Sequence, residues 1–249
     1  RALLEGMVDK GQADDAWEYA STSPHLQSLL SLRGLAPPTN PYGPVWGGRE
    51  EVGEVLSLSA DIRIVWVADV AGVEMCRKAL EAAGEVGIDS EWRHPRPSSL
   101  LQIATLEEVF LIDVALADAQ ACVQGGFASA VENLVNWLLC DFPGTALGFS
   151  FASDASRLTS LFSSIDPDAI RVTDCQPLGA ALPGGNGNRG HGEGLYSCCR
   201  QLLGKGLDKA QQCSNWDRRP LLDTQIKYAA LDAWVLLPLH AAQRAKSHV

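Results

Sequence analysis

The feature that most constrains the fold is a series of short apolar runs that begins at Ile62. Four runs rich in β-branched residues, separated by turns or one helical stretch, read IRIVWV, EVGIDSEW, LLQIATL and EVFLIDV. After them come a helical pattern (FASAVENLVNWLLCDF), a strand (TALGFSF), a helix (ASRLTSLFSSI), a strand (AIRVTD) and a long helix from about Asp223 to Ala245. A meander followed by β-α-β predicts an α/β fold, a mixed sheet with helices on its faces.

The residues before this region predict a separate, smaller unit. The first thirty or so have helical spacing interrupted by the turn signal DKGQADD, which predicts a helical hairpin. The following stretch, GLAPPTNPYGPVWGG, has four prolines and four glycines in fifteen residues, a composition typical of an irregular linker. We therefore expect a helical hairpin and linker over residues 1–55 and one larger domain over residues 56–249.

Composition narrows the class of protein. With 249 residues, 46% hydrophobic and 20% charged, the chain is typical of a globular protein with a sizeable core. It has no apolar run of membrane-spanning length, and its first twenty residues are amphipathic, unlike a signal peptide. The seven cysteines form no C-x-x-C pair, which argues against a zinc site or a disulfide framework. We expect an intracellular protein, cytoplasmic or nuclear.

The segment GEVGIDSEWRHPR places two acids at the end of a buried strand. Residues two apart on a strand project from the same face, so Asp89 and Glu91 direct both carboxylates to one spot while Ser90 faces away. Alone, such a pair is most often the exposed end of a strand. Other acids must decide between that interpretation and a functional site.

Two further acids lie at positions where a carboxylate is unusual or has a specific structural role. Asp232 lies inside the apolar run of the last helix, and Tyr228 precedes it by four residues, hence on the same helix face. Asp154 follows the strand TALGFSF at or near a helix start, where an N-cap is an equally good interpretation. Three aspartates and one glutamate together would repel one another unless they held divalent cations, and hard oxygen ligands suit Mg²⁺ or Mn²⁺.

In order and context these residues resemble the three motifs of the DEDDy 3'-5' exonucleases. GIDSEW carries Asp89 and Glu91, GFSFASDASRL carries Asp154, and YAALDA carries Tyr228 and Asp232. The segment that contains SNWDRRPL resembles the one before the third motif in RNase D-like enzymes, especially the nibbler or mutator branch. The resemblance runs from about Ile62 to His240.

This resemblance implies an RNase H-like fold and hydrolysis with two metal ions that releases nucleoside monophosphates from a 3' end. It also implies a helical domain before the nuclease. The implied metal ligands are Asp89, Glu91, Asp154 and Asp232, and we expect Tyr228 to orient the attacking water. The leading hypothesis is an exonuclease acting on single-stranded 3' ends, RNA more readily than DNA. The alternatives are a DNA-directed exonuclease of the same family, a catalytically silent nucleic-acid-binding module and, least favoured, an interaction scaffold.

The charge distribution bears on substrate binding. The net charge of −10 opposes binding to nucleic acid, but the segment from Arg200 to Lys227 carries about +3. The residues we expect near the substrate are Arg200, Arg218 and Arg219 at phosphates and Trp92 or Phe151 at the terminal nucleotide. Packing or simple solvent exposure remains the alternative for the basic residues. The overall acidity predicts modest, salt-sensitive affinity and basic surface supplied by further domains or partners.

The glycine-rich insert PGGNGNRGHGEG, Pro183 to Gly194, is the one low-complexity stretch. It lacks the G-K-[ST] ending of a phosphate-binding P-loop, and no strand leads directly into it. We expect a mobile surface loop.

Overall fold

The computed structural model describes residues 54–120, 126–176 and 194–247. The expected helical hairpin, nearly all of the expected linker and the glycine-rich insert up to residue 193 lie outside these residues. The strands are β1 (Arg63–Val67), β2 (Glu85–Glu91), β3 (Leu100–Ala104), β4 (Glu108–Ile112), β5 (Thr145–Gly148) and β6 (Thr173–Asp174). The helices are α4 (Val70–Glu81), α5 (Val114–Ala119), α6 (Phe127–Cys140), α7 (Ala152–Leu161), the 3-10 turn η1 (Pro167–Ala169), α8 (Leu195–Leu203), α9 (Asp223–Trp234) and α10 (Leu236–Ser247).

The strands form one mixed sheet in the order β1-β4-β3-β2-β5-β6. The expected meander is present, because β2, β3 and β4 pair antiparallel with their neighbours in sequence. Strands β1 and β4, β2 and β5, and β5 and β6 pair in parallel. The predicted α/β fold, a mixed sheet flanked by helices, is confirmed.

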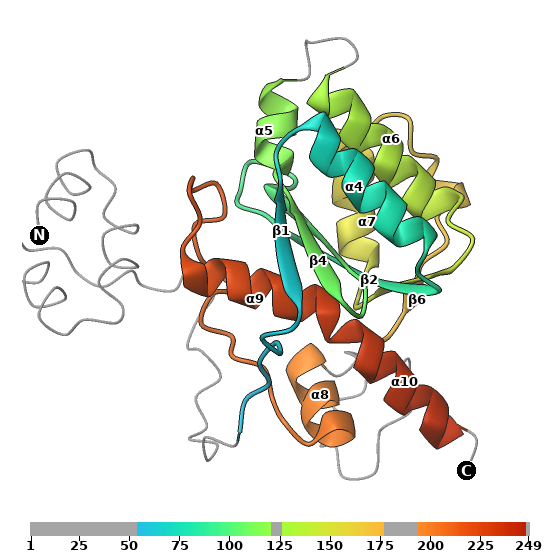
Figure 1. Cartoon of the computed structure of the whole chain (residues 1–249), viewed down its shortest axis with the longest axis vertical. Coiled ribbons are helices and arrows are strands. Elements are labelled where there is room, and N and C mark those ends of the chain that lie inside the picture. The colour runs from blue at the N-terminus through green and yellow to red at the C-terminus, as the bar shows by residue number, and fades with distance from the viewer. Residues whose placement is uncertain (1–53, 121–125, 177–193, 248–249) are drawn as a thin grey trace, which may run out of the picture. The chain divides into compact units, whose positions relative to one another are not determined.

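Strand alternation divides the apolar residues into one core on each face of the sheet. On β3, Leu101 and Ile103 join the core formed with α4, α6 and α7, which cover one face (Figure 1). Their neighbours Leu100 and Ala104 join the core formed with α9, which crosses the other face.

The same alternation orients β2. Val86 and Ile88 belong to the core under α4, α6 and α7. Gly87, Asp89 and Glu91 therefore face α9, while Ser90 faces the layer that contains α7. The end of β2 thus presents its two acids to one helix and its serine to another.

Three features differ from the expectations. The long last helix is divided into α9 and α10 at Val235, since Pro238 has no amide hydrogen for the Trp234 carbonyl and its ring crowds that oxygen. Most of the strand predicted from AIRVTD is not a strand, because only Thr173 and Asp174 pair with β5. Helix α8, directly after the glycine-rich insert, was not predicted. Among the described residues, no helix combines the length and apolarity that crossing a bilayer requires.

Candidate active site

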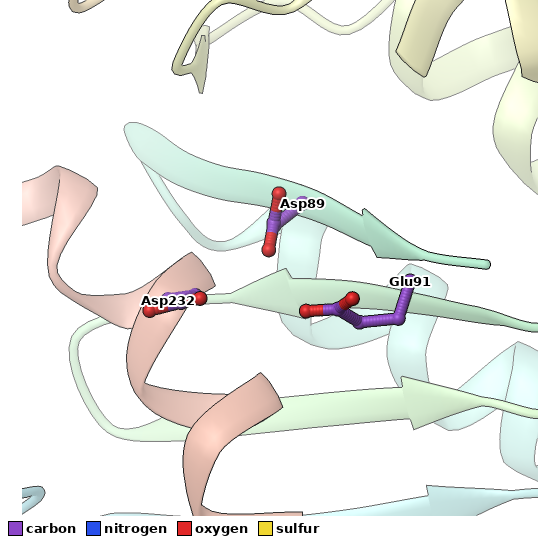
Figure 2. Close-up of side chains that lie close together, drawn as sticks. All are labelled: Asp89, Glu91 and Asp232. Carbon is purple, nitrogen blue, oxygen red and sulfur yellow. The ribbon is translucent and has the colours of Figure 1, made fainter. Parts of the chain in front are cut away.

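Three carboxylates converge between the end of β2 and the last turn of α9. One oxygen from each of Asp89, Glu91 and Asp232 lies within 4.8 Å of the others. Figure 2 shows the three side chains directed toward a common point, two from the strand and one from the helix. Acids that are 143 residues apart in the chain, the separation of Asp89 from Asp232, thus meet in one cluster.

A close approach of α9 to the sheet makes this cluster possible. A β-carbon built on Gly87 would come within 2.0 Å of the Ala233 carbonyl oxygen. Gly87 pairs with Ala104 on β3, and α9 presents Ala229, Ala230 and Ala233 to this side of the sheet. Small residues on both surfaces therefore let the helix backbone lie against the strand, which brings Asp232 beside Asp89.

The negative charge of this cluster is energetically unfavourable. Glu91 is 8% exposed and Asp232 is 9% exposed, so water screens their repulsion poorly. Burial raises the pKa of Asp232 to about 7, although the hydrogen bond from Tyr228 opposes the shift. Burial also raises the pKa of Asp89, and the charges of Asp232 and Asp154 raise it further. A divalent cation would remove this repulsion and let all the acids ionise.

Asp154 lies on the opposite side of β2, in the first turn of α7. Its Oδ1 accepts a hydrogen bond of 2.6 Å from the Ser90 hydroxyl. Burial raises the Asp154 pKa, while this hydrogen bond and the charge of Arg157 oppose the rise. The residue at the N-cap position of α7 is Phe151, not Asp154. Asp154 is therefore connected to the cluster through Ser90 and through its charge, but it is not one of the three converging acids.

Tyr228 lies one helical turn before Asp232 and donates its phenol hydrogen to that carboxylate. Burial and the charges of Asp232 and Glu91 raise the pKa of the phenol, so it stays protonated at neutral pH. Its ring packs against Trp216, with ring centroids 6.0 Å apart. The hydroxyl is therefore a positioned hydrogen-bond donor.

Two of the predicted substrate residues make extensive contacts within the fold. Phe151 is 5% exposed, and its side chain packs in the core and against Gly148. The Arg219 guanidinium makes an ion pair with Asp113 and donates to the carbonyl oxygens of Trp216, Arg218 and Ser99. These contacts occupy its donors and leave none for a phosphate. Both residues stabilise the fold.

The surroundings of Arg219 explain why the segment SNWDRRPL is structural in large part. Trp216 is fully buried beneath α9. Asp217 accepts hydrogen bonds from the Ser99 hydroxyl (2.6 Å) and Arg96 Nε (3.2 Å). Together with the Arg219 contacts, they fasten the loop that follows β2 to the segment that precedes α9. The two elements that carry the acids are thereby held together.

The other three predicted substrate residues have exposed surface. Trp92 directly follows Glu91 and is 38% exposed. Arg200 is exposed on α8, and Arg218 is partly exposed and donates to the Pro220 carbonyl. The substrate roles of Trp92, Arg200 and Arg218 stay predictions.

Two residues near the acids were not singled out from the sequence. Gln102 lies directly opposite Asp89 on β3, so its side chain projects from the same face of the sheet. It is fully buried, and its amide nitrogen and oxygen have no partner within the described part of the chain. Arg157 follows Asp154 by three residues, and its guanidinium lies 3.4 Å above the Trp92 ring. A polar residue inside LLQIA and a basic residue one turn after an expected ligand were the available signals.

Comparison with known proteins agrees with this geometry. The family model described as 3'-5' exonuclease matches residues 64–245. A human protein, the exonuclease mut-7 homolog, is 38% identical over 173 residues, which are 63% of this chain and 19% of the relative. Ribonuclease D of Haemophilus influenzae is 45% identical over 51 residues, 20% of this chain and 13% of the relative.

A solved structure supports the fold. The Nibbler EXO domain of Aedes aegypti superposes with a TM-score of 0.59 at 24% sequence identity, and the match covers 78% of this chain and 93% of that domain. The RNase H-like fold expected from the sequence is thereby confirmed. The chain spans 19% of the length of the human relative and 13% of the length of the Haemophilus influenzae relative.

Proposed function

The chain belongs to the 3'-5' exonuclease family, and on this premise we propose that it removes nucleoside monophosphates from single-stranded 3' ends by two-metal-ion hydrolysis. The observation that carries the proposal is the convergence of Asp89, Glu91 and Asp232 within 4.8 Å. Buried acids that repel one another have no evident structural benefit, whereas their convergence suits a metal-dependent hydrolase.

Two Mg²⁺ or Mn²⁺ ions fit the groups present. Asp89, Glu91 and Asp232 are all hard oxygen donors, and burial holds the pKa values of Asp89 and Asp232 above their ordinary range. The unpartnered amide of Gln102 beside Asp89 offers a further polar contact for hydrated ions. Asp89, Glu91 and Asp232 would hold the ions, and Asp154 would be a further ligand. When bound, the ions lower the pKa of water and stabilise the leaving oxygen.

The protein's own groups would orient the reaction. Tyr228 would position the attacking water through its hydroxyl oxygen, which can accept a hydrogen bond while its hydrogen is donated to Asp232. A phenol that remains protonated at neutral pH is a poor base, so its role would be orientation. Ser90 would hold the Asp154 carboxylate in one orientation through the hydrogen bond of 2.6 Å. Trp92 would pack near the terminal nucleotide, and Arg218 and Arg200 would contact phosphates.

We favour RNA over DNA as the substrate. The relative from Haemophilus influenzae is named a ribonuclease, and it matches this chain at 45% identity over 51 residues. DNA-directed hydrolysis by the same acids is the second candidate. The acidic net charge of −10 favours weak, salt-sensitive binding unless further domains or partner proteins supply basic surface. The six described cysteines form no disulfide, and we propose a reducing cytoplasmic or nuclear compartment for the chain.

One experiment tests activity, polarity, sugar preference and metal together. Single-stranded RNA and DNA oligonucleotides of one sequence, labelled at either the 3' or the 5' end, are incubated with Mg²⁺, Mn²⁺ or EDTA. We expect 5'-labelled RNA to shorten progressively and 3'-labelled RNA to release a labelled mononucleotide at once, with no reaction in EDTA. Intact oligonucleotides in both metals would contradict the proposal, and equal rates on DNA would contradict the preference for RNA.

A further inference from the structure

A cleft that none of the predicted metal ligands lines lies along helix α7. Its volume is about 430 Å³. The residues that line it are Pro95, Pro97, Ser153, Ser156, Arg157 and Ser160. The four helical residues recur at spacings of three and four and therefore share one face of α7. The cleft thus offers three hydroxyl groups and one guanidinium, with no carboxylate among its lining residues.

Arg157 is held in place by an aromatic ring, yet one of its donor groups is unused. Its guanidinium stacks on Trp92 at 3.4 Å, and its Nε is buried with no acceptor among the described residues. Arg77 provides the comparison within the same molecule, since it stacks on Trp137 at 3.3 Å in the same manner. The Nε of Arg77, however, donates to Glu81 at 2.8 Å. The Nε of Arg77 therefore has an acceptor within the protein. The guanidinium of Arg157 is fixed by an aromatic ring in the same way, but its Nε lacks an acceptor among the described residues.

The position of the cleft relates it to the acids. Trp92 directly follows Glu91, and Ser153 directly precedes Asp154. Because the cleft is lined by neither Asp89, Glu91 nor Asp232, a phosphate inside it would not be the one undergoing hydrolysis. A phosphate in the cleft would therefore belong to another nucleotide of the strand.

We propose that the cleft binds a phosphodiester of the single-stranded substrate, with Arg157 as the cationic donor, Trp92 as its support and Ser153 and Ser156 as hydroxyl donors. The proposal rests on the exonuclease function above and adds a subsite to it. A planar guanidinium that is already oriented loses little freedom when it donates to a phosphate, and the pairing needs no base contact. Binding at this site should accordingly be independent of sequence.

The test measures binding without hydrolysis. The full chain carrying Asp232→Asn is titrated against 5'-fluorescein-labelled single-stranded eight-nucleotide RNA of two different sequences, at several salt concentrations. Arg157→Ala should weaken binding of both sequences by roughly ten- to a hundredfold, the scale of a charged hydrogen-bonded contact. It should also reduce the slope of log affinity against log salt by about 0.7, as expected for one lost phosphate contact to a single strand. Arg77→Ala, the matched control, should change neither quantity.

A second variant covers the case in which Arg157→Ala does not fold. Ser156 is exposed, so Ser156→Asp places a negative charge in the cleft without disturbing the core. This variant should also bind the RNA more weakly. Wild-type affinity and salt slope in either folded variant would overturn the proposal. An equal loss of affinity for a nucleoside 5'-monophosphate and for the RNA would overturn the assignment to the strand.

The two proposals fail in different ways. If the wild-type chain degrades no oligonucleotide with Mg²⁺ or Mn²⁺ but Arg157→Ala still weakens binding, the exonuclease function is wrong and the phosphate cleft stands. If the wild-type chain degrades RNA and Arg157→Ala binds it normally, the cleft assignment is wrong and the exonuclease function stands.

Discussion

The Ala233 carbonyl oxygen occupies the space that a β-carbon on Gly87 would need, at a separation of only 2.0 Å. Gly87 lies two residues before Asp89, and Ala233 directly follows Asp232. The contact between a strand glycine and a helix backbone therefore sets the distance between two of the three clustered acids.

Gly87→Ala should displace α9 and separate the acids. Overpacking of this kind costs about 1–3 kcal/mol of stability, and misplacing a catalytic group by about 1 Å costs roughly a hundredfold in rate. Thermal melting and the rate of RNA shortening measure the two effects. Gly84→Ala is the control, since nothing lies within 4 Å of its added β-carbon. Equal activity in the two variants would show that the close approach does not position the acids.

Asp89→Asn and Asp232→Asn should each lower hydrolysis by roughly a thousandfold or more, the scale of several kcal/mol of transition-state stabilisation by metal ions. Calorimetric titration with Mn²⁺ should show weaker binding while the circular dichroism spectrum is unchanged. Asp168→Asn, at an exposed aspartate in η1, should keep full activity. Full activity in either site variant would disprove the assignment of that acid.

Tyr228→Phe should slow turnover by roughly ten- to a thousandfold, because a single positioned hydrogen-bonding group is removed. Affinity for Mn²⁺ and for the oligonucleotide should remain close to that of the wild type. Single-turnover rates and calorimetry separate the two quantities. Wild-type turnover, or a loss of metal binding as large as in Asp232→Asn, would contradict the water-orienting role.

The metal-free protein should lose stability as the pH rises from 5 to 8. The pKa of an unfolded aspartate is about 3.9, whereas burial raises that of Asp232 to about 7 in the folded protein. Between these values the folded state binds more protons than the unfolded state, so the stabilisation present at low pH is lost as the pH passes through 7. Melting curves in EDTA should show this decline, and Asp232→Asn should reduce it. Mn²⁺ should restore stability at pH 8, and a melting temperature that rises with pH in EDTA would contradict the expectation.

Replacing Arg218 and replacing Arg219 by alanine should affect different properties, RNA binding in the first case and stability in the second. Arg219→Ala leaves the carboxylate of Asp113, whose side chain is 6% exposed, without its ion pair. We expect a loss of about 2–4 kcal/mol of stability, below the upper end for buried pairs because the Arg219 side chain is 27% exposed. Arg218→Ala should keep stability but weaken RNA binding equally for all sequences, with a flatter salt dependence. Urea unfolding measures the stability of both variants, and titration with RNA measures their affinity. Lost stability in Arg218→Ala together with weaker RNA binding in Arg219→Ala would contradict this assignment.

Local periodicity was sufficient to predict much of this protein. The two-residue repeat of a strand placed Asp89 and Glu91 on one face, and the four-residue spacing of a helix paired Tyr228 with Asp232. The order of strands and helices similarly predicted a mixed sheet, which the structure contains. These features depend on neighbours within one turn or one strand, and such neighbours can be recognised in the sequence itself.

Contacts between distant segments were decided only by the tertiary structure. Nothing near Phe151 or Arg219 in the sequence shows that one ring enters the core or that one guanidinium is taken by Asp113, 106 residues away. The stack of Arg157 on Trp92 likewise joins helix α7 to the residue that follows β2, and periodicity does not relate these two segments. Whether a charged or aromatic side chain is available to a ligand depends on which partners the folded chain brings to it, and burial in three dimensions determines those partners.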